Sequence, residues 1–188
     1  MITKGQPGWA PEVWPDYSYN PDKAAELVKV DYPKGVTVEL FHIVREPDNQ
    51  FGQLIQAMWN KVGIKTELKS LERVAWIASM RKDTFQAAFF VTSPYPEGFI
   101  QVYLLSGAGA NWPNISNPNV DKLLLEHSRT VDQSKRHELL KEALKIVYES
   151  AELTCVYAVP LAVATHKNVI GIRSLWKVVH AGEIWMSS

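Results

Sequence analysis

Residues 85–99 read FQAAFFVTSPYPEGF, and this stretch indicates the fold class more clearly than any other part of the chain. Its first seven residues carry almost no polar side chain, which is typical of a strand that is buried on both faces. The residues that follow, TSPYPEG, hold two prolines and a glycine, so they cannot continue a strand or a helix. The sequence therefore predicts a central strand over 85–91 that ends in an aromatic loop over 92–99.

The segments before this strand alternate between strand and helix patterns. VTVELFHI (36–43) and IKTELKSL (64–71) predict two more strands. Helices are predicted over 51–63, which ends at a left-handed Gly63, and over 74–83. Such alternation implies right-handed crossovers and a mostly parallel sheet flanked by helices, an α/β fold. In open sheets of this kind ligands bind beyond the carboxyl ends of the strands, which is where loop 92–99 would lie.

Three further helices have recognisable first residues. Asn20 precedes Pro21, Asn117 precedes Pro118, and Asp132 precedes the pattern SKRHELLKEALKIVYESA. Asn and Asp accept hydrogen bonds from the first turn, and proline at the first position loses no bond there. The positions predicted to be buried are Ala24, Ala25, Leu27 and Val28 in the first of these helices, Leu54, Ile55, Met58 and Val62 in the helix over 51–63, and Leu139, Leu140, Ala143, Leu144 and Val147 in the last.

Composition excludes several classes of function. Twenty basic and twenty acidic residues cancel, so nothing favours a nucleic acid or an anionic membrane as partner. The single cysteine, Cys155, reads as a small apolar residue in a predicted buried strand over 153–166. The five histidines share no metal-ligand spacing, His127 and His137 lie on helices predicted to be exposed, and no nucleophile or phosphate-binding motif occurs. We therefore expect no catalytic residue, no metal and no cofactor.

Several segments, in order along the chain, resemble one family. They are YNPDKAAELVK (19–29), GIKTELKSLE (63–72), FQAAFFV with its loop, LLSG (104–107), NISNPNVDKLLLE (114–126), DQSKRHELLKEALKIVYESA (132–151) and HKNVIGI (166–172). Together they are similar to the extracellular solute-binding proteins of family 5, the peptide- and nickel-binding receptors of ABC importers. The resemblance implies a type II periplasmic binding protein-like fold, of which this chain would supply mainly the lobe called domain III.

The resemblance also implies a division of the chain and a set of partners. Residues 1–19 would be an extended arm, 20–166 the carboxyl-terminal α/β lobe, and 167–188 a tail that crosses back to the other lobe. Arm and tail would both dock on the missing N-terminal lobe of the same polypeptide. The two lobes would close around a small solute and deliver it to ABC permease subunits. The expected location is periplasmic or extracellular, with a lipoprotein anchor as an alternative.

The predicted solute contacts centre on the loop over 92–99. Peptide-binding relatives have a pattern close to Gly-Trp-x-x-Asp-Tyr here, whose aspartate holds the peptide amino terminus. This chain keeps Tyr95 but has Ser93-Pro94 where the acid should fall, and Glu97 is offset. Because a desolvated ammonium needs a carboxylate, we expect a neutral, ring-shaped, oligosaccharide-like solute rather than an ordinary free-amine peptide. The predicted contacts are Ser93, Tyr95, Phe99, Asn111 and Trp112, with simple packing as the alternative for each aromatic ring.

Two more residues are expected at the same edge of the sheet. Arg73 follows the strand over 64–71 and would bind a carboxylate or phosphate, unless it is only a solvated helix-start residue. His42 lies at the end of the strand over 36–43 and would face the cleft, unless it is hydrogen-bonded in the interior. Two other functions stay open: a scaffold or regulatory domain that reuses this lobe without transport, and an enzyme. An export signal upstream in the parent gene would favour the receptor over the scaffold.

Overall fold

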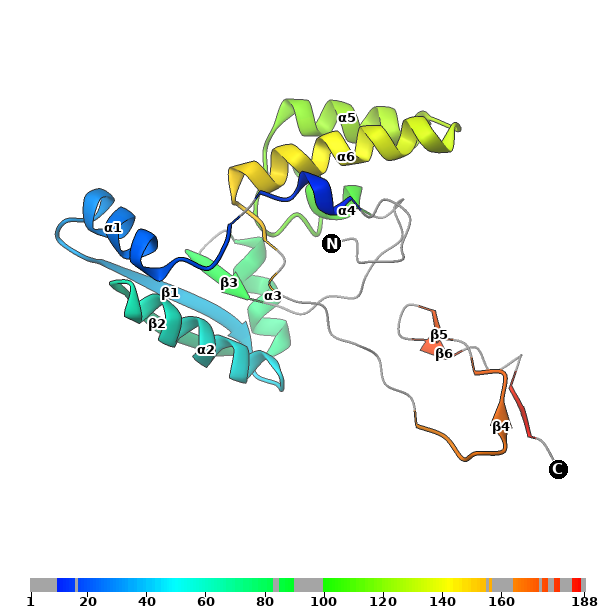
Figure 1. Cartoon of the computed structure of the whole chain (residues 1–188), viewed down its shortest axis with the longest axis horizontal. Helices are drawn as coiled ribbons and strands as arrows, with labels where there is room; N and C mark the ends of the chain where they lie inside the picture. The colour runs from blue at the N-terminus through cyan, green and yellow to red at the C-terminus, as the bar shows by residue number, and fades with distance from the viewer. Residues whose placement is uncertain are drawn as a thin grey trace. The chain divides into compact units, whose positions relative to one another are not determined.

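The computed structural model of the chain describes residues 10–15, 17–82, 85–89, 100–154, 156, 164–172, 174–175, 178–179 and 184–186. The chain divides into two compact units (Figure 1). The sheet unit comprises Pro15–Thr92 and Trp112–Asn114. The helical unit comprises Met1–Trp14, Ser93–Asn111 and Ile115–Ser188. The residues of the lobe predicted over 20–166 are thus shared between two units.

Three parallel strands form the sheet unit: β1 (Val36–Ile43), β2 (Ile64–Leu71) and β3 (Ala87–Phe89). Their order is β2-β1-β3. β1 and β2 pair along their whole length, whereas β3 pairs only with the carboxyl-terminal half of β1. The predicted parallel sheet flanked by helices is confirmed. The third strand begins at Ala87 rather than at Phe85, and residues 90 and 91 lie outside the described residues.

The helices of this unit are α1 (Pro21–Asp31), α2 (Asp48–Lys61) and α3 (Arg73–Arg81). The predicted cap of α1 is confirmed, because Asn20 Oδ1 accepts a hydrogen bond from the Lys23 amide at 2.9 Å. α2 begins at Asp48 rather than at Phe51, and a carboxylate in the first turn is favoured by the helix dipole. α2 stops before Gly63, whose φ of 95° lies in the left-handed region that favours glycine.

α2 turns a more polar side to the sheet than its apolar pattern predicts. Gln56 Nε2 donates to the Thr66 carbonyl at 2.8 Å, and Asn60 Oδ1 accepts from the Thr66 amide at 2.9 Å. These bonds satisfy backbone groups of β2, an edge strand of its sheet. Leu54 and Met58 lie on another side of the helix and are 52% and 42% exposed, so their predicted burial is wrong.

α1 departs from prediction in the same way. None of its residues is fully buried, and Leu27, predicted to be in its buried stripe, is half exposed. Val28 does reach the neighbouring turn: a side-chain carbon at Gly63 would lie 3.7 Å from its methyl group. Helical spacing thus identified the apolar positions of α1 correctly, but it does not reveal how many of them another element covers.

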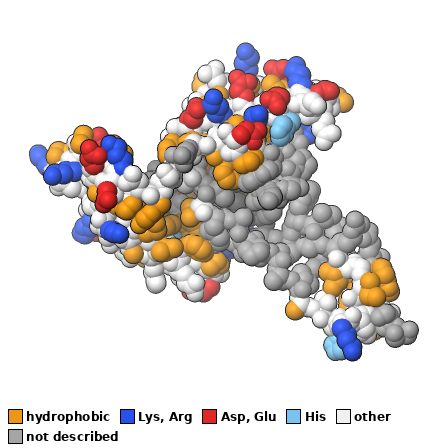
Figure 2. Space-filling view, in the orientation of Figure 1, with side chains coloured by type: hydrophobic (Ala, Val, Ile, Leu, Met, Phe, Trp, Pro, Cys, Tyr) orange, Lys and Arg blue, Asp and Glu red, His pale blue; other side chains and the backbone are white. Residues whose placement is uncertain are grey.

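The helical unit is built on α5 (Pro118–Arg129) and α6 (Gln133–Ser150), which lie side by side, with the short α4 (Gln101–Leu104) beside α5 (Figure 1). Both predicted caps are confirmed: Asn117 accepts from Asn119 and Val120, and Asp132 accepts from Lys135. Figure 2 shows acidic and basic side chains mixed over these helices. The buried core residues of the helices are Leu104, Val120, Leu124, Leu140, Ala143, Leu144, Val147 and Tyr148.

His127 lies inside this unit, which corrects the expectation that it is on an exposed helix. Only 2% of the residue is exposed, and it lies on the face of α5 that also buries Val120 and Leu124. These three positions follow helical spacing, so His127 continues the apolar stripe of α5 toward its last turn. Because the sequence around His127 is polar, the pattern did not indicate that the buried face of α5 extends to this residue.

The described part of the amino-terminal arm also belongs to the helical unit. Its 3-10 helix η1 (Pro11–Val13) contributes buried Val13, and Ala10 precedes it in the same core. Glu12 pairs with Lys141 of α6 at 3.1 Å, and the ring of Trp14 meets Tyr148 edge-on at 6.1 Å. Within the predicted arm, residues 10–14 are therefore packed against α6, and docking of the arm on the other lobe stays a prediction.

The carboxyl-terminal tail contains short antiparallel pairs, β4 (Val169–Ile170) with β7 (Trp185–Met186) and β5 (Ser174–Leu175) with β6 (Val178–Val179). Most of the strand predicted over 153–166, with Cys155, lies outside the described residues. Among the residues that the structure describes, no helix has the length and apolar character needed to cross a membrane.

Candidate functional site

The carboxyl ends of the three strands meet at one edge of the sheet. Ile43 is paired with Leu71, and His42 is paired with both Ser70 and Phe89, so all three strands end at the same level. The Val44 amide donates to the Leu71 carbonyl at 2.9 Å and carries the pairing one step past β1. We call residues 44–48 and 72–73, which follow β1 and β2, the sheet rim. This is the edge at which open parallel sheets bind their ligands.

Arg73 occupies the rim position that the sequence predicted. It is the first residue of α3, and its side chain is exposed. Within the described part of the chain it forms no ion pair. Its neighbour Glu72 precedes α3 in an extended conformation and makes no side-chain cap bond. Direct contact between Arg73 and a solute remains a prediction.

A second charged pair at the rim was missed by sequence reasoning. Arg45 Nε donates to Asp48 Oδ2 at 2.9 Å, and Asp48 is completely buried in the first turn of α2. The pair ties the segment after β1 to the start of the next helix. The second carboxylate oxygen of Asp48, Oδ1, has no hydrogen-bond partner among the described residues. The only signal in the sequence was an acid at the start of a helix, which is common.

His42 lies beneath the rim rather than on it. Only 2% of the residue is exposed; its Nε2 lies 2.9 Å from Ser70 Oγ and its Nδ1 lies 3.2 Å from the Ile43 carbonyl oxygen. This burial argues against direct contact with a solute and matches the hydrogen-bonded alternative. The distance to Ser70 is that of a nucleophile and its base, but Nδ1 faces a carbonyl instead of the carboxylate of a hydrolase triad.

Trp112 packs in the apolar cluster under the same edge. Its ring meets Trp76 of α3 edge-on, with 5.2 Å between centroids and 90° between planes. Ile43, Trp76 and Met80 are the buried members of this cluster, and Trp112 is half-buried against them. Part of the indole therefore holds the sheet unit together. Contact between Trp112 and a solute remains a prediction.

Asn111 has a structural role within the helical unit. Its side-chain amide donates to the carbonyls of Leu105 and Ile115 at 2.9 and 2.7 Å, and its oxygen accepts from the Ile115 amide at 3.0 Å. All of its amide atoms are therefore used in bracing its own loop, which argues against the predicted contact with a solute. The other predicted contacts, Ser93, Tyr95 and Phe99, lie outside the described residues.

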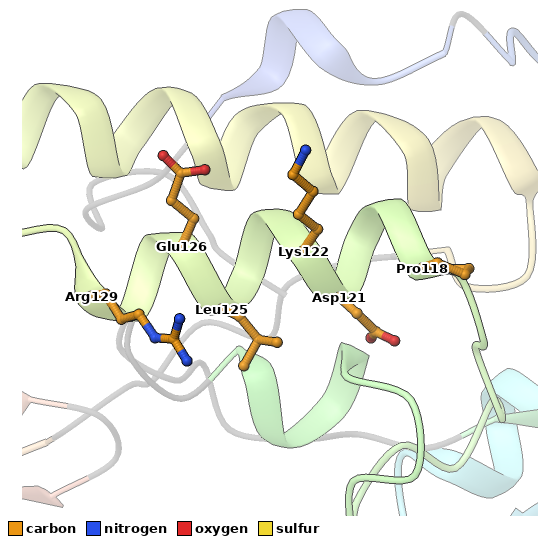
Figure 3. Close-up of a pocket in the computed structure, with 6 residues that line it drawn as sticks. All are labelled: Pro118, Asp121, Lys122, Leu125, Glu126 and Arg129. Atoms are coloured by element: carbon orange, nitrogen blue, oxygen red, sulfur yellow. The ribbon is translucent and has the colours of Figure 1, made fainter.

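The helical unit carries a hollow of about 560 Å³ on the side of α5, lined by Pro118, Asp121, Lys122, Leu125, Glu126 and Arg129 (Figure 3). Its charges are partly used by neighbours: Asp121 Oδ1 accepts from the Ser106 amide at 2.9 Å. A hydrogen bond from Lys135 lowers the pKa of Glu126. Among the described residues, no cluster of histidine, cysteine or acidic side chains could hold a metal ion.

Comparison with solved structures defines the class of fold. The chain superposes on HbpA2 of Haemophilus parasuis with a TM-score of 0.77 and 21% identity, covering 96% of this chain and 38% of that one. It superposes on a dipeptide-binding protein of a Pseudoalteromonas species, solved with Met-Leu, with a TM-score of 0.73 and 19% identity, covering 98% and 39%. The fold is that of the type II periplasmic binding proteins.

Residues 1–112 match the family described as "Bacterial extracellular solute-binding proteins, family 5 Middle". The chain belongs to this family. It is 27% identical over 147 residues to "Heme-binding protein A" of Haemophilus influenzae, covering 72% of this chain and 27% of that protein. It is 26% identical over 148 residues to "Dipeptide-binding protein" of Escherichia coli, covering 72% and 28%. The chain thus spans about a quarter to a third of the length of the curated relatives that it matches.

Proposed function

We propose that this chain is part of the substrate-binding component of an ABC importer. The component closes around a small solute, such as an oligopeptide or an oligosaccharide, and delivers it to permease subunits. The observation that carries the proposal is the family match over residues 1–112, the part of the chain that forms the parallel sheet and its rim. The parent protein works outside the cytoplasm, in the periplasm or at the cell surface. No chemical step is assigned to it.

The rim forms one wall of the solute site in this proposal. Arg73 supplies a cation with no ion-pair partner in the described chain, and the exposed part of Trp112 supplies an aromatic surface. Ser93, Tyr95 and Phe99 of the loop over 92–99 remain solute contacts predicted from the sequence alone. Aromatic faces combined with a few polar groups are the usual lining of sites for small polar solutes.

The opposite wall comes from the other lobe of the same polypeptide. Two lobes that close about a hinge exclude water from the solute between them. Because only one wall is present here, we expect this chain by itself to bind solute feebly. A titration that finds tight, stoichiometric binding by the isolated chain would contradict this division of the site.

A thermal-shift screen of the complete receptor tests the function. The panel contains dipeptides such as Met-Leu, longer peptides, oligosaccharides, heme and metal chelates. A ligand at one hundred times its Kd stabilises the folded state by about 2.7 kcal/mol, which is easily detected. We expect the unfolding midpoint to rise with one class of solute, and rather with oligosaccharides than with free-amine peptides. If no compound raises the midpoint, the proposed function is not supported; a peptide as the best ligand would overturn only the choice of solute.

A further inference from the structure

His42 is in contact with three elements of the sheet unit. It lies on β1, its Nε2 is 2.9 Å from Ser70 Oγ of β2, and its ring packs against Gly52 of α2. A side-chain carbon added at Gly52 would lie 3.1 Å from the ring carbon Cδ2 and 3.3 Å from Nε2. A side chain at residue 52 would therefore require the ring of His42 or α2 to shift by a few tenths of an ångström.

The two hydrogen bonds of the ring define its chemistry. The Ile43 carbonyl only accepts, so Nδ1 must donate to it. In the neutral imidazole the lone pair is then on Nε2, and it accepts the hydroxyl proton of Ser70. Both ring nitrogens are satisfied in the interior, where an unsatisfied polar group is destabilising.

Both partners of the ring stand immediately before the rim. Ile43 is the last residue of β1, and Ser70 precedes the last residue of β2. The next tie along the chain joins the Val44 amide to the Leu71 carbonyl. The ends of β1 and β2 are thus joined twice: by the side-chain hydrogen bond between His42 and Ser70, and by the backbone hydrogen bond between Val44 and Leu71. Arg45 and Arg73 each follow shortly after these bonds in the sequence.

We propose that His42 is a positioning residue of the sheet rim. It fixes the ends of β1 and β2 through Ile43 and Ser70, so that the rim is ordered before a solute arrives. This inference rests on the proposed function, because the benefit of an ordered rim is a smaller entropic cost of binding. The ring itself does not touch the solute.

The test compares four variants of the complete receptor. Ser70→Ala removes the hydroxyl alone, His42→Leu removes both bonds, and His42→Gln retains an oxygen that can accept from Ser70. Gly52→Ala keeps the histidine but displaces its ring. Amide hydrogen exchange is followed by NMR at Val44, with Val38 at the other end of β1 and Leu144 of α6 as references.

A positioning role predicts a local effect. Ser70→Ala, His42→Leu and Gly52→Ala should each accelerate exchange at Val44 by about tenfold while Val38 and Leu144 change little, and His42→Gln should restore part of the protection. Unchanged exchange at Val44, or equal acceleration at all three amides, would overturn the proposal. If His42→Leu does not fold, Ser70→Ala alone decides, because residue 70 is exposed and its hydroxyl is small.

Binding gives a second readout. Met-Leu and maltotriose are titrated into the wild type and into Ser70→Ala. For whichever probe binds the wild type, we expect an affinity about threefold to tenfold weaker in the variant. If neither probe binds the wild type, the result counts against a receptor for dipeptides or oligosaccharides. The hydrogen-exchange pattern still decides whether His42 positions the rim.

Discussion

The sheet unit and the helical unit bury polar side chains in different ways. The helical unit encloses a continuous apolar core in which Leu140, Ala143 and Val120 are fully buried, and its two buried polar side chains in the described chain, His127 and Asn111, lie on α5 and in the loop before it. The sheet unit has a smaller apolar cluster, and it buries His42, Asp48 and Thr66 close to the ends and edge of its strands. We infer that the core of the helical unit mainly stabilises the fold. In the sheet unit, part of the interior consists of polar side chains that hold the rim in position.

The largest loss of stability is expected when a core side chain of the helical unit is truncated. Leu140→Ala removes a completely buried side chain from α6, and we expect the free energy of unfolding to fall by about 2–5 kcal/mol. Leu125→Ala, at a half-exposed position on α5, is the matched control and should lower it by less than about 1 kcal/mol. Urea unfolding of the complete receptor measures both. Equal losses would mean that the core does not lie where we describe it.

The next effect concerns the close contact in the sheet unit. We expect Gly52→Ala to lower the free energy of unfolding by about 1–3 kcal/mol, because the new carbon meets the ring of His42 at 3.1 Å. Gly109→Ala in the helical unit is the control, since nothing lies within 4 Å of the added carbon. A Gly52→Ala variant as stable as the Gly109→Ala variant would contradict the expected steric cost of a side chain against the ring of His42.

Trp112, in the apolar cluster beneath the rim, should affect both stability and binding. Trp112→Ala removes the edge-on contact with Trp76, and such a contact contributes about 0.5–1.5 kcal/mol beyond the area it buries. Trp112→Phe keeps a ring there and should recover most of the stability. In the complete receptor we expect the alanine variant to bind solute more weakly than the phenylalanine variant, as measured by calorimetry. Equal affinity in the two variants and the wild type would mean that the ring serves only for packing.

Replacing Arg73 should affect solute binding but hardly affect stability. Because it is exposed and makes no ion pair in the described chain, we expect Arg73→Gln to change the free energy of unfolding by less than about 0.5 kcal/mol. A solute that carries a carboxylate should bind this variant more weakly, whereas a neutral sugar should bind it as it binds the wild type. Parallel titrations with one solute of each kind check this, and a loss of affinity for the neutral sugar alone would contradict it.

The smallest effect is expected at the surface of the helical unit, where Glu12 of the arm meets Lys141. Hydrogen bonds from its own backbone and from Lys141 lower the pKa of Glu12, and the bond to Glu12 raises the pKa of Lys141. The contribution of Glu12 is therefore complete above the ordinary glutamate pKa and disappears as pH falls through the lowered value. That of Lys141 is complete below the ordinary lysine pKa and disappears as pH rises through the raised value.

The stabilisation by this pair should accordingly be present between about pH 5 and pH 10. We expect wild type and Glu12→Gln to differ slightly in unfolding midpoint within that range and to converge in acid. Thermal unfolding over a pH series measures the difference, and salt should reduce it. A difference that persists at pH 2 would contradict the role given to the carboxylate.

Local signals in the sequence predicted much of this architecture. Asn20, Asn117 and Asp132 begin helices as expected, because a cap is a matter of a few neighbouring residues. The parallel sheet followed from the order of its elements. Leu54 and Met58 were assigned to the interior wrongly, since helical spacing reveals which positions are apolar but not whether another element covers them.

The site was less predictable than the fold. The topology predicted that Arg73 lies at the carboxyl edge of the sheet, where the structure has it, but the bond between Ser70 and His42 joins two strands that are far apart in sequence. No spacing rule reveals such a pair. The pair of Arg45 and Asp48 is local, yet it gives no signal until the burial of Asp48 is known. The hydrogen bonds of Asn111 to its own loop were also not predictable, because an amide in a loop looks the same in sequence whether it binds a ligand or its own backbone.

The central proposal is that the rim is the solute-facing part of this chain. NMR of the complete receptor during titration with its solute tests this most directly, by locating the amides whose shifts change. We predict changes at Val44–Asp48, Glu72–Arg73 and Trp112 in the sheet unit, with none along α5 beside its hollow. Changes confined to Pro118–Arg129, with an unaltered rim, would contradict it.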